Sequence, residues 1–193
     1  IDDKAFINCY NMISIQLPAN LNTIGWNAFD GCSSLTGIKI PKTLKDAGVG
    51  NIYSPFTNCT ALKTIEFEEG LTSIPTGLFY GCSAIEEITI PKSVVSIGEQ
   101  AFYYCTNLKK VTFSPYITYI GQEAFAYNYS LQSVEPPAAL VELSGKSFAA
   151  CTSLTEIVIP KNVSRGPYGY GAPFRDCTNL KKVTFEQGMK VIP

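Results

Sequence analysis

Residues 86–113 read EEITIPKSVVSIGEQAFYYCTNLKKVTF, and variants of this stretch recur throughout the chain. The most constant residue is the phenylalanine near its middle, Phe102, which has counterparts at spacings of 23, 26 or 27 residues. A fixed period of this length predicts a solenoid, in which each repeat buries its apolar face against its neighbours. The recurring phenylalanines are Phe6, Phe29, Phe56, Phe79, Phe102, Phe125, Phe148 and Phe174.

Other positions are named here by their offset from this phenylalanine. Offsets +6, +9 and +11 are apolar in nearly every copy, as in Leu108, Val111 and Phe113. The alternation from +9 to +11 predicts a short strand with one face inside. Proline often follows at +12 and ends the strand, whereas Pro136 at +11 interrupts the pattern. A second short extended piece is expected at +15 to +18, and a single helical turn is expected to carry the next phenylalanine inward.

This pattern closely resembles the BspA-like leucine-rich repeats, whose unit is LxxIxIPxxVxxIGxxAFxxC. The resemblance covers the whole chain in eight in-phase copies, and the alanine expected before phenylalanine is replaced in four of them, by Pro55, Leu78, Ser147 and Pro173. It implies a right-handed repeat solenoid, with a parallel β-sheet of short strands on one face and short helical turns or extended pieces opposite. It also implies a surface or secreted protein of a bacterium or a parasitic protist.

The repeat predicts one domain. Residues 1–193 are expected to form a single leucine-rich-repeat solenoid of about eight 23-residue repeats, with insertions near 49–54 and 165–172. No apolar stretch is long enough to cross a membrane, so we do not expect this segment to insert into one. Both ends fall inside a repeat without the polar caps of a solenoid. We therefore expect a piece of a longer protein, with any export signal or anchor outside this segment.

Offset +3 is cysteine in seven of the eight copies and Asn128 in the other. One cysteine per coil at a core offset, without a CxxC pair or any histidine, argues against a metal site. We expect a ladder of buried, reduced thiols, although disulfides between neighbouring coils remain an alternative. Asn128 then needs hydrogen-bond partners inside the core.

The charge balance and the absence of histidine indicate which partners and which reactions to exclude. Fifteen basic and sixteen acidic residues without a basic stripe do not suit a nucleic-acid partner. Without histidine the chain lacks the usual general base, and its glycine pairs lack the context of a phosphate-binding loop. We therefore expect no enzyme, no catalytic residue, no cofactor and no bound metal.

Three features are candidates for binding. The first is the outward side of the strands, at +8 and +10, where Glu87 is expected beside Lys110 of the next coil. The alternative for these charges is a solvated ladder that fixes the register of the strands. The candidate residues on this strand face are Lys39, Glu66, Glu87, Thr89, Lys110, Thr112, Glu135, Glu156, Lys182 and Thr184.

The second feature is a concentration of tyrosines in the middle coils, and the third is the pair of insertions. Tyrosine is enriched at protein interfaces, although packing between coils would also explain these residues. The insertions place further tyrosines on longer loops, which are either functional or tolerated additions. The tyrosines of the middle coils are Tyr80, Tyr103, Tyr104, Tyr116, Tyr119, Tyr127 and Tyr129, of which Tyr103, Tyr104 and Tyr127 are the principal candidates; those of the insertions are Tyr53, Tyr168 and Tyr170.

The sequence therefore predicts a non-enzymatic extracellular or cell-surface module for protein interaction or adhesion, with a protein of a host or neighbouring cell as its ligand. One alternative is a structural spacer on a cell-surface protein. Another is a carbohydrate-binding module.

Overall fold

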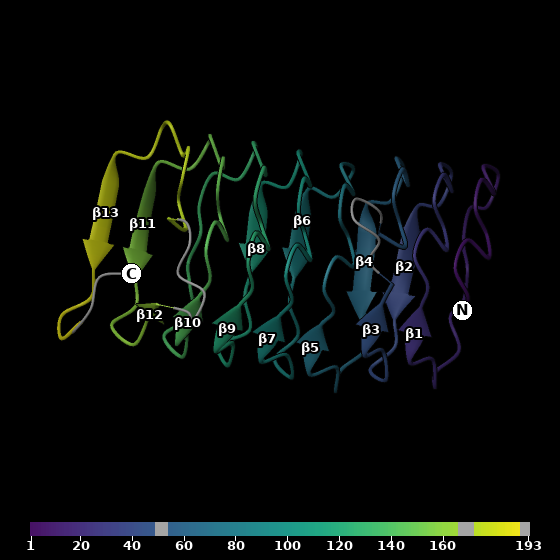
Figure 1. The fold of residues 1–193 in the computed structure, drawn as a ribbon, viewed down its shortest axis with the longest axis horizontal. Coiled ribbons are helices and arrows are strands. Elements are labelled where there is room, and N and C mark those ends of the chain that lie inside the picture. The colour runs from purple at the N-terminus through teal and green to yellow at the C-terminus, as the bar shows by residue number, and fades with distance from the viewer. Residues whose placement is uncertain (49–53, 166–171, 190–193) are drawn as a thin grey trace.

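A computed structural model describes residues 1–48, 54–165 and 172–189 and shows an elongated parallel β-solenoid (Figure 1). The chain winds along the long axis of the molecule from one terminus to the other, so each coil packs against the coil before it and the coil after it. Every strand pair in the described part of the chain is parallel. The predicted solenoid with short parallel strands is confirmed.

The longer strands occupy the offsets at which the sequence alternates between polar and apolar residues. In β2, Ile38 and Ile40 are buried and Lys39 is exposed. Hydrogen-bonded pairs form between β2 and β4, between β6 and β8, and between β11 and β13. The coil of Pro136, which breaks the apolar pattern, contributes only isolated bridges to the strands on either side, because proline has no N–H group to donate to a ladder. The longer strands are β2 (Gly37–Ile40), β4 (Thr64–Phe67), β6 (Glu87–Thr89), β8 (Lys110–Thr112), β11 (Glu156–Ile159) and β13 (Lys182–Phe185).

A second set of two-residue strands forms the predicted extended pieces. They make one two-stranded sheet, β1–β3, and one five-stranded sheet in the order β12-β10-β9-β7-β5. The short strands are β1 (Thr23–Ile24), β3 (Asp46–Ala47), β5 (Ser73–Ile74), β7 (Ser96–Ile97), β9 (Tyr119–Ile120), β10 (Glu142–Leu143) and β12 (Ser164–Arg165).

The segment around each phenylalanine differs from the predicted helical turn. No helix occurs among the described residues, and this segment is a run of turns with left-handed residues at offsets −2 and +2 in most coils. In one coil these are Gln100, with a φ of 52°, and Tyr104, with a φ of 59°. Every second N–H group of this segment points to the next coil. The N–H groups of Gln100, Phe102 and Tyr104 donate to carbonyls of that coil at 2.9, 2.8 and 2.9 Å. We call offsets −2 to +2 the turn face.

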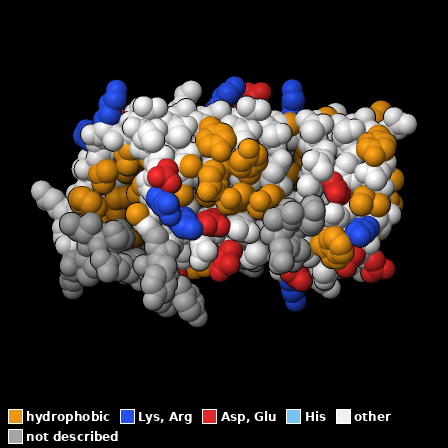
Figure 2. Space-filling view, turned by 45° about the horizontal axis from the view of Figure 1, so that its top comes forward, with side chains coloured by type: hydrophobic (Ala, Val, Ile, Leu, Met, Phe, Trp, Pro, Cys, Tyr) orange, Lys and Arg blue, Asp and Glu red, His pale blue; other side chains and the backbone are white. Residues whose placement is uncertain are grey.

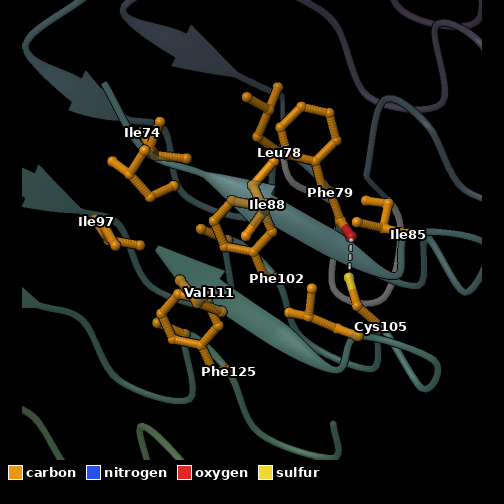
Figure 3. Packing of buried hydrophobic residues seen from close by; sticks show 14 of the residues in the cluster. Ile74, Leu78, Phe79, Ile85, Ile88, Ile97, Phe102, Cys105, Val111 and Phe125 are labelled. Atoms are coloured by element: carbon orange, nitrogen blue, oxygen red, sulfur yellow. Dashed lines mark hydrogen bonds between the residues drawn. The ribbon is translucent and has the colours of Figure 1, made fainter. Parts of the chain in front are cut away.

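The repeated phenylalanines form a continuous column of stacked rings inside the solenoid. Consecutive ring centroids lie 5.2 to 5.8 Å apart, with interplanar angles of 4° to 20°. Strand residues such as Ile88 and Val111 pack beside the column (Figure 3). The six rings from Phe29 to Phe148 are fully buried, so the phenylalanine ladder is the centre of the core.

The cysteines join consecutive coils. Cys105 Sγ donates to the carbonyl of Phe79, in the preceding coil, at 3.2 Å (Figure 3). Five other cysteines make the equivalent bond, and all seven cysteines are free; six of them are buried as the thiol ladder predicts, whereas Cys9, in the first coil, is only partly buried. Asn128 replaces the thiol by donating from Nδ2 to the carbonyls of Phe102 at 3.0 Å and Phe125 at 2.7 Å. Its Oδ1 is buried without a hydrogen-bond partner.

Candidate functional site

The strand-face candidates are all exposed on the outward side of the longer strands and their flanks. The register places Lys39 beside Glu66, and Glu87 beside Lys110. The register also places Thr89 beside Thr112 and Glu156 beside Lys182. The remaining candidates are Thr184, which lies in β13, and Glu135, which follows the bridge residue Val134. Equal offsets therefore lie side by side, as predicted, and form a row of mixed charge. Ligand binding by this row stays a prediction.

Two ion pairs lie on this face: Lys182 Nζ lies 3.9 Å from Glu156 Oε2, which joins two of the strand-face candidates, and the other pair forms one residue away from the predicted Glu87–Lys110. Lys109 Nζ lies 2.6 Å from Glu86 Oε2, whereas no ion pair joins Glu87 to Lys110. Both partners are about half exposed, so solvent screens the pair and it contributes little to stability. This pair and its neighbours fit the solvated ladder that fixes register.

Five tyrosines of three consecutive coils form one network of ring contacts on and beside the turn face. Tyr80 stacks on Tyr103 at a centroid distance of 4.7 Å, and Tyr103 lies 5.1 Å from Tyr127. Tyr129 meets Tyr104 and Tyr127 edge-on, at 5.9 and 6.3 Å. We call these five residues the tyrosine cluster. Figure 2 shows apolar and aromatic side chains gathered near the middle of one face of the rod, with charged side chains beside them.

Two exposed tyrosines of the cluster have a strained backbone conformation. Tyr104 and Tyr127 are 45% and 36% exposed, and their φ angles are 59° and 61°. A bulky side chain in this left-handed region costs about 1–2 kcal/mol, whereas glycine and asparagine tolerate it better. The other coils place smaller residues at this offset, namely Asn8, Gly31, Asn58, Gly81, Ala150 and Asp176.

A polar row borders the cluster at offset −2. Gln100 Nε2 donates to Glu123 Oε2 at 2.8 Å, and Lys146 Nζ lies 3.4 Å from Glu123 Oε1. Burial, and to a lesser extent nearby charges that include Glu123, raises the pKa of Tyr80 and of Tyr103. Their hydroxyl groups therefore stay protonated and able to donate hydrogen bonds at neutral pH. Sequence analysis missed Gln100, Glu123 and Lys146, although their shared offset was the available signal.

The other predicted tyrosines do not join the cluster. Tyr116 is exposed and Tyr119 lies in β9, and neither makes a ring contact among the described aromatic residues. The tyrosines of the insertions, Tyr53, Tyr168 and Tyr170, lie outside the described residues. The structure thus brings together Tyr103, Tyr104 and Tyr127 with Tyr80 and Tyr129.

The buried thiols are not reactive at neutral pH. Burial raises the pKa of Cys59 and of Cys105 to about 12, so these thiols are not ionised nucleophiles at neutral pH. In residues 1–48, 54–165 and 172–189, no group of three or more His, Cys, Asp or Glu side chains is placed to hold a metal ion. The same ranges contain no helix of the length and hydropathy needed to cross a membrane. The tyrosine cluster offers aromatic area, hydroxyl donors and an adjacent ion pair.

Comparisons with known proteins give consistent matches. A family model described as the BspA type leucine rich repeat region matches six copies, over residues 1–83 and 52–169. A leucine-rich repeat protein from Bacteroides ovatus is 26% identical, with a TM-score of 0.54, and the alignment covers 97% of this chain and 61% of that one. The leucine-rich repeat protein of T. pallidum is 30% identical, with a TM-score of 0.71 and coverages of 87% and 78%. This chain therefore spans about three fifths of the first of these structures, and no curated protein matches it.

Proposed function

Because this chain belongs to the BspA-type leucine-rich repeat family, we propose that it is a protein-interaction module and that the tyrosine cluster is its recognition surface. Solenoids of stacked repeats provide extended surfaces that bind other proteins. We place the module outside the cell or at its surface, as an adhesive scaffold without catalytic activity for proteins of a host or neighbouring cell. The family resemblance supports this location and role.

The backbone strain at Tyr104 and Tyr127 carries the choice of surface. Residues held in a rare backbone conformation are concentrated at functional sites. Where only folding matters, a residue that adopts this conformation with less strain can take the position. Glycine or asparagine occupies the same offset in four other coils, so the fold itself has no need of a tyrosine there. Binding is a reason to keep two large, exposed rings in this position.

The chemistry of the cluster favours a protein as its ligand. Tyrosine supplies a large rigid contact area with a hydroxyl group at its edge, and tyrosine is enriched among the residues that dominate binding energy. The cluster combines exposed rings with the Glu123–Lys146 ion pair at its border. This is the arrangement of an apolar centre with a polar rim, which protein interfaces share. The strand face lacks such a centre where Lys39, Glu66, Glu87 and Lys110 lie.

A binding screen with paired variants tests this proposal. The chain is exposed to immobilised extracellular-matrix and host-surface proteins, and any binding is compared with that of Tyr104→Asn/Tyr127→Asn. Asparagine tolerates the left-handed backbone, so relief of strain offsets part of the lost ring contacts and we expect the stability to change by no more than about 1–2 kcal/mol. We expect binding to be lost in this variant and kept in the strand-face control Lys110→Ala/Thr112→Ala.

Three outcomes would contradict the proposal. The first is an absence of binding to every protein on the panel. The second is binding that survives loss of both tyrosines but not the strand-face substitutions, which would move recognition to the strands. The third is a glycan-array signal that depends on Tyr104 and Tyr127 without any protein ligand, which would favour a carbohydrate-binding module.

A further inference from the structure

The backbone hydrogen bonds between coils stop at one plane of the solenoid. Pairing joins β2 to β4 and β6 to β8, but it does not join β4 to β6. The short strands divide as well, because β3 pairs only with β1 while β5 belongs to the sheet that continues through β7. These two breaks separate the same two groups of strands, β1–β4 and β5–β13. We call the plane between these groups the seam.

The turn face is interrupted at the same plane. The N–H group of Phe29 donates to the next coil at 2.8 Å, and that of Phe79 does so at 2.9 Å. Phe56 is the exception, because its N–H group bonds to Ser54 Oγ of its own coil at 3.3 Å. The column of inter-coil bonds on the turn face therefore ends at Phe56 and begins again at Phe79.

Within the ranges that the structure describes, only side chains connect the two sides of the seam, apart from the crossing chain itself and its turn, in which the N–H group of Leu71 donates to the Glu68 carbonyl at 3.2 Å. Ser54 Oγ donates to the carbonyl of Tyr80 at 3.1 Å, and Cys82 Sγ lies 3.7 Å from the carbonyl of Phe56. The latter is the longest bond of the thiol ladder. Apolar contacts complete the boundary, with the ring of Phe79 at 5.6 Å from Phe56 and 6.1 Å from Phe67.

The sequence contains two reasons for the break in the ladders. Offset +19 is glycine in four coils, and a Cβ atom at one of them, Gly98, would lie only 2.5 Å from the backbone nitrogen of Thr76. At the seam this offset is Pro75, which brings a ring to a position of close approach and has no N–H group to donate. The second residue is Leu78, which is fully buried at an offset where Ala28, Ala101 and Ala124 are buried in three other coils and the preceding coil has Pro55. Its larger side chain requires more room between the coils.

We propose that the solenoid consists of two cooperative bodies, one formed by residues 1–48 and 54–68 and the other by residues 70–165 and 172–189, which unfold separately and move against each other at the seam. In repeat proteins, cooperativity passes from coil to coil through the interface between neighbours, so a weak interface divides the array. The chain crosses the seam next to Gly70, whose φ of 100° suits glycine and gives the connection its freedom. The tyrosine cluster lies wholly on the second body and touches the first through the Tyr80 carbonyl.

The chain contains a natural probe for each body. Trp26 is its one tryptophan and belongs to the first body, whereas the tyrosine cluster belongs to the second. Urea unfolding is followed by tryptophan fluorescence and by the near-ultraviolet circular dichroism of tyrosine. We expect two transitions with different midpoints. The matched variants are Leu35→Ala in the first body and Leu108→Ala in the second, both at fully buried leucines of offset +6.

Each variant has an expected result and an opposite one. We expect Leu35→Ala to lower the midpoint of the tryptophan signal alone and Leu108→Ala to lower that of the tyrosine signal alone. If both signals move together in both variants, the solenoid is one cooperative unit and the proposal fails. The variant Pro75→Gly/Leu78→Ala restores the common residues at both offsets, and we expect it to merge the two transitions. Transitions that stay apart in this variant would overturn the assignment of the seam to Pro75 and Leu78.

Discussion

Replacement of Asn128 by cysteine tests the account of the thiol ladder. Asn128 occupies the one copy in which the offset +3 is not cysteine. Its Nδ2 donates to the carbonyls of Phe102 and Phe125, but its Oδ1 is buried without a partner. A thiol in its place needs only one acceptor, as Cys105 shows by its bond to Phe79. We therefore expect Asn128→Cys to stabilise the fold.

The magnitude follows from the bonds that are lost and kept. A buried acceptor without a partner costs about 1–3 kcal/mol, and the variant removes it. The thiol keeps the bond to Phe102, while the bond to Phe125, worth about 0.5–1.5 kcal/mol, is lost. The carbonyl of Phe125 still accepts from Cys151 Sγ at 3.3 Å. The net gain in the free energy of unfolding is about 1 kcal/mol, or about 2–4 °C in Tm.

Thermal and urea unfolding, followed by the tyrosine signal, measure this change. The reciprocal variant Cys105→Asn is the control, because it places an amide oxygen in a fully buried position of a neighbouring coil. We expect it to lower the free energy of unfolding by about 1–3 kcal/mol. A loss of stability in Asn128→Cys, or a neutral Cys105→Asn, would refute the reasoning.

Three further predictions concern the core. Phe102→Ala should lower the free energy of unfolding by about 3–5 kcal/mol in urea titrations because it opens a cavity in the ring column; an unchanged midpoint would contradict the core position. Gly98→Ala should lower Tm, at a cost of about 1–3 kcal/mol, because its Cβ would lie 2.5 Å from the Thr76 nitrogen, and a neutral result would disprove this close approach. Burial raises the pKa of Cys105 from 9.0 to about 12, so its contribution is complete below pH 9 and is lost as the pH rises towards 12, by up to about 1.4 kcal/mol per pH unit. Urea titrations between pH 8 and 11 measure this loss, and a flat profile would contradict it.

The solenoid was predictable because its signal repeats. The burial pattern of β2 follows the alternation of Ile38, Lys39 and Ile40. The phenylalanine ladder could be predicted from the repeat period alone. The prediction of a helical turn was wrong because every second N–H group of this segment, such as that of Phe102, donates to the next coil, and only those between, such as that of Tyr103 to the Gln100 carbonyl, bond within the segment. Asparagine or glycine at −2 and +2, as in Asn27 and Gly31, was the local sign of the left-handed residues.

The tyrosine cluster could be predicted only in part. The sequence shows a concentration of tyrosines in the middle coils, but the stacking of the coils decides which rings meet. Tyr80 and Tyr103 share an offset and stack, whereas Tyr116 and Tyr119 lie at offsets far from the turn face. The Glu86–Lys109 ion pair differs from the predicted one for a similar reason, because adjacent offsets are almost equally close and side-chain conformation selects between them.

The peptide groups on the turn face share one orientation along the rod. The group between Ala124 and Phe125 accepts from Phe102 at its carbonyl and donates to Ser147 at its N–H. Peptide dipoles of about 3.5 D that are aligned in this way add up, as they do in an α-helix. On the turn face, each of the two bodies therefore has a row of aligned peptide dipoles with their positive ends towards the C-terminal coil, whereas N–H groups of the short-strand face, such as that of Gly98, point the other way. At the seam the dipoles of the two turn faces meet head to tail, an arrangement that attracts the bodies to each other even where the backbone hydrogen bonds between coils stop.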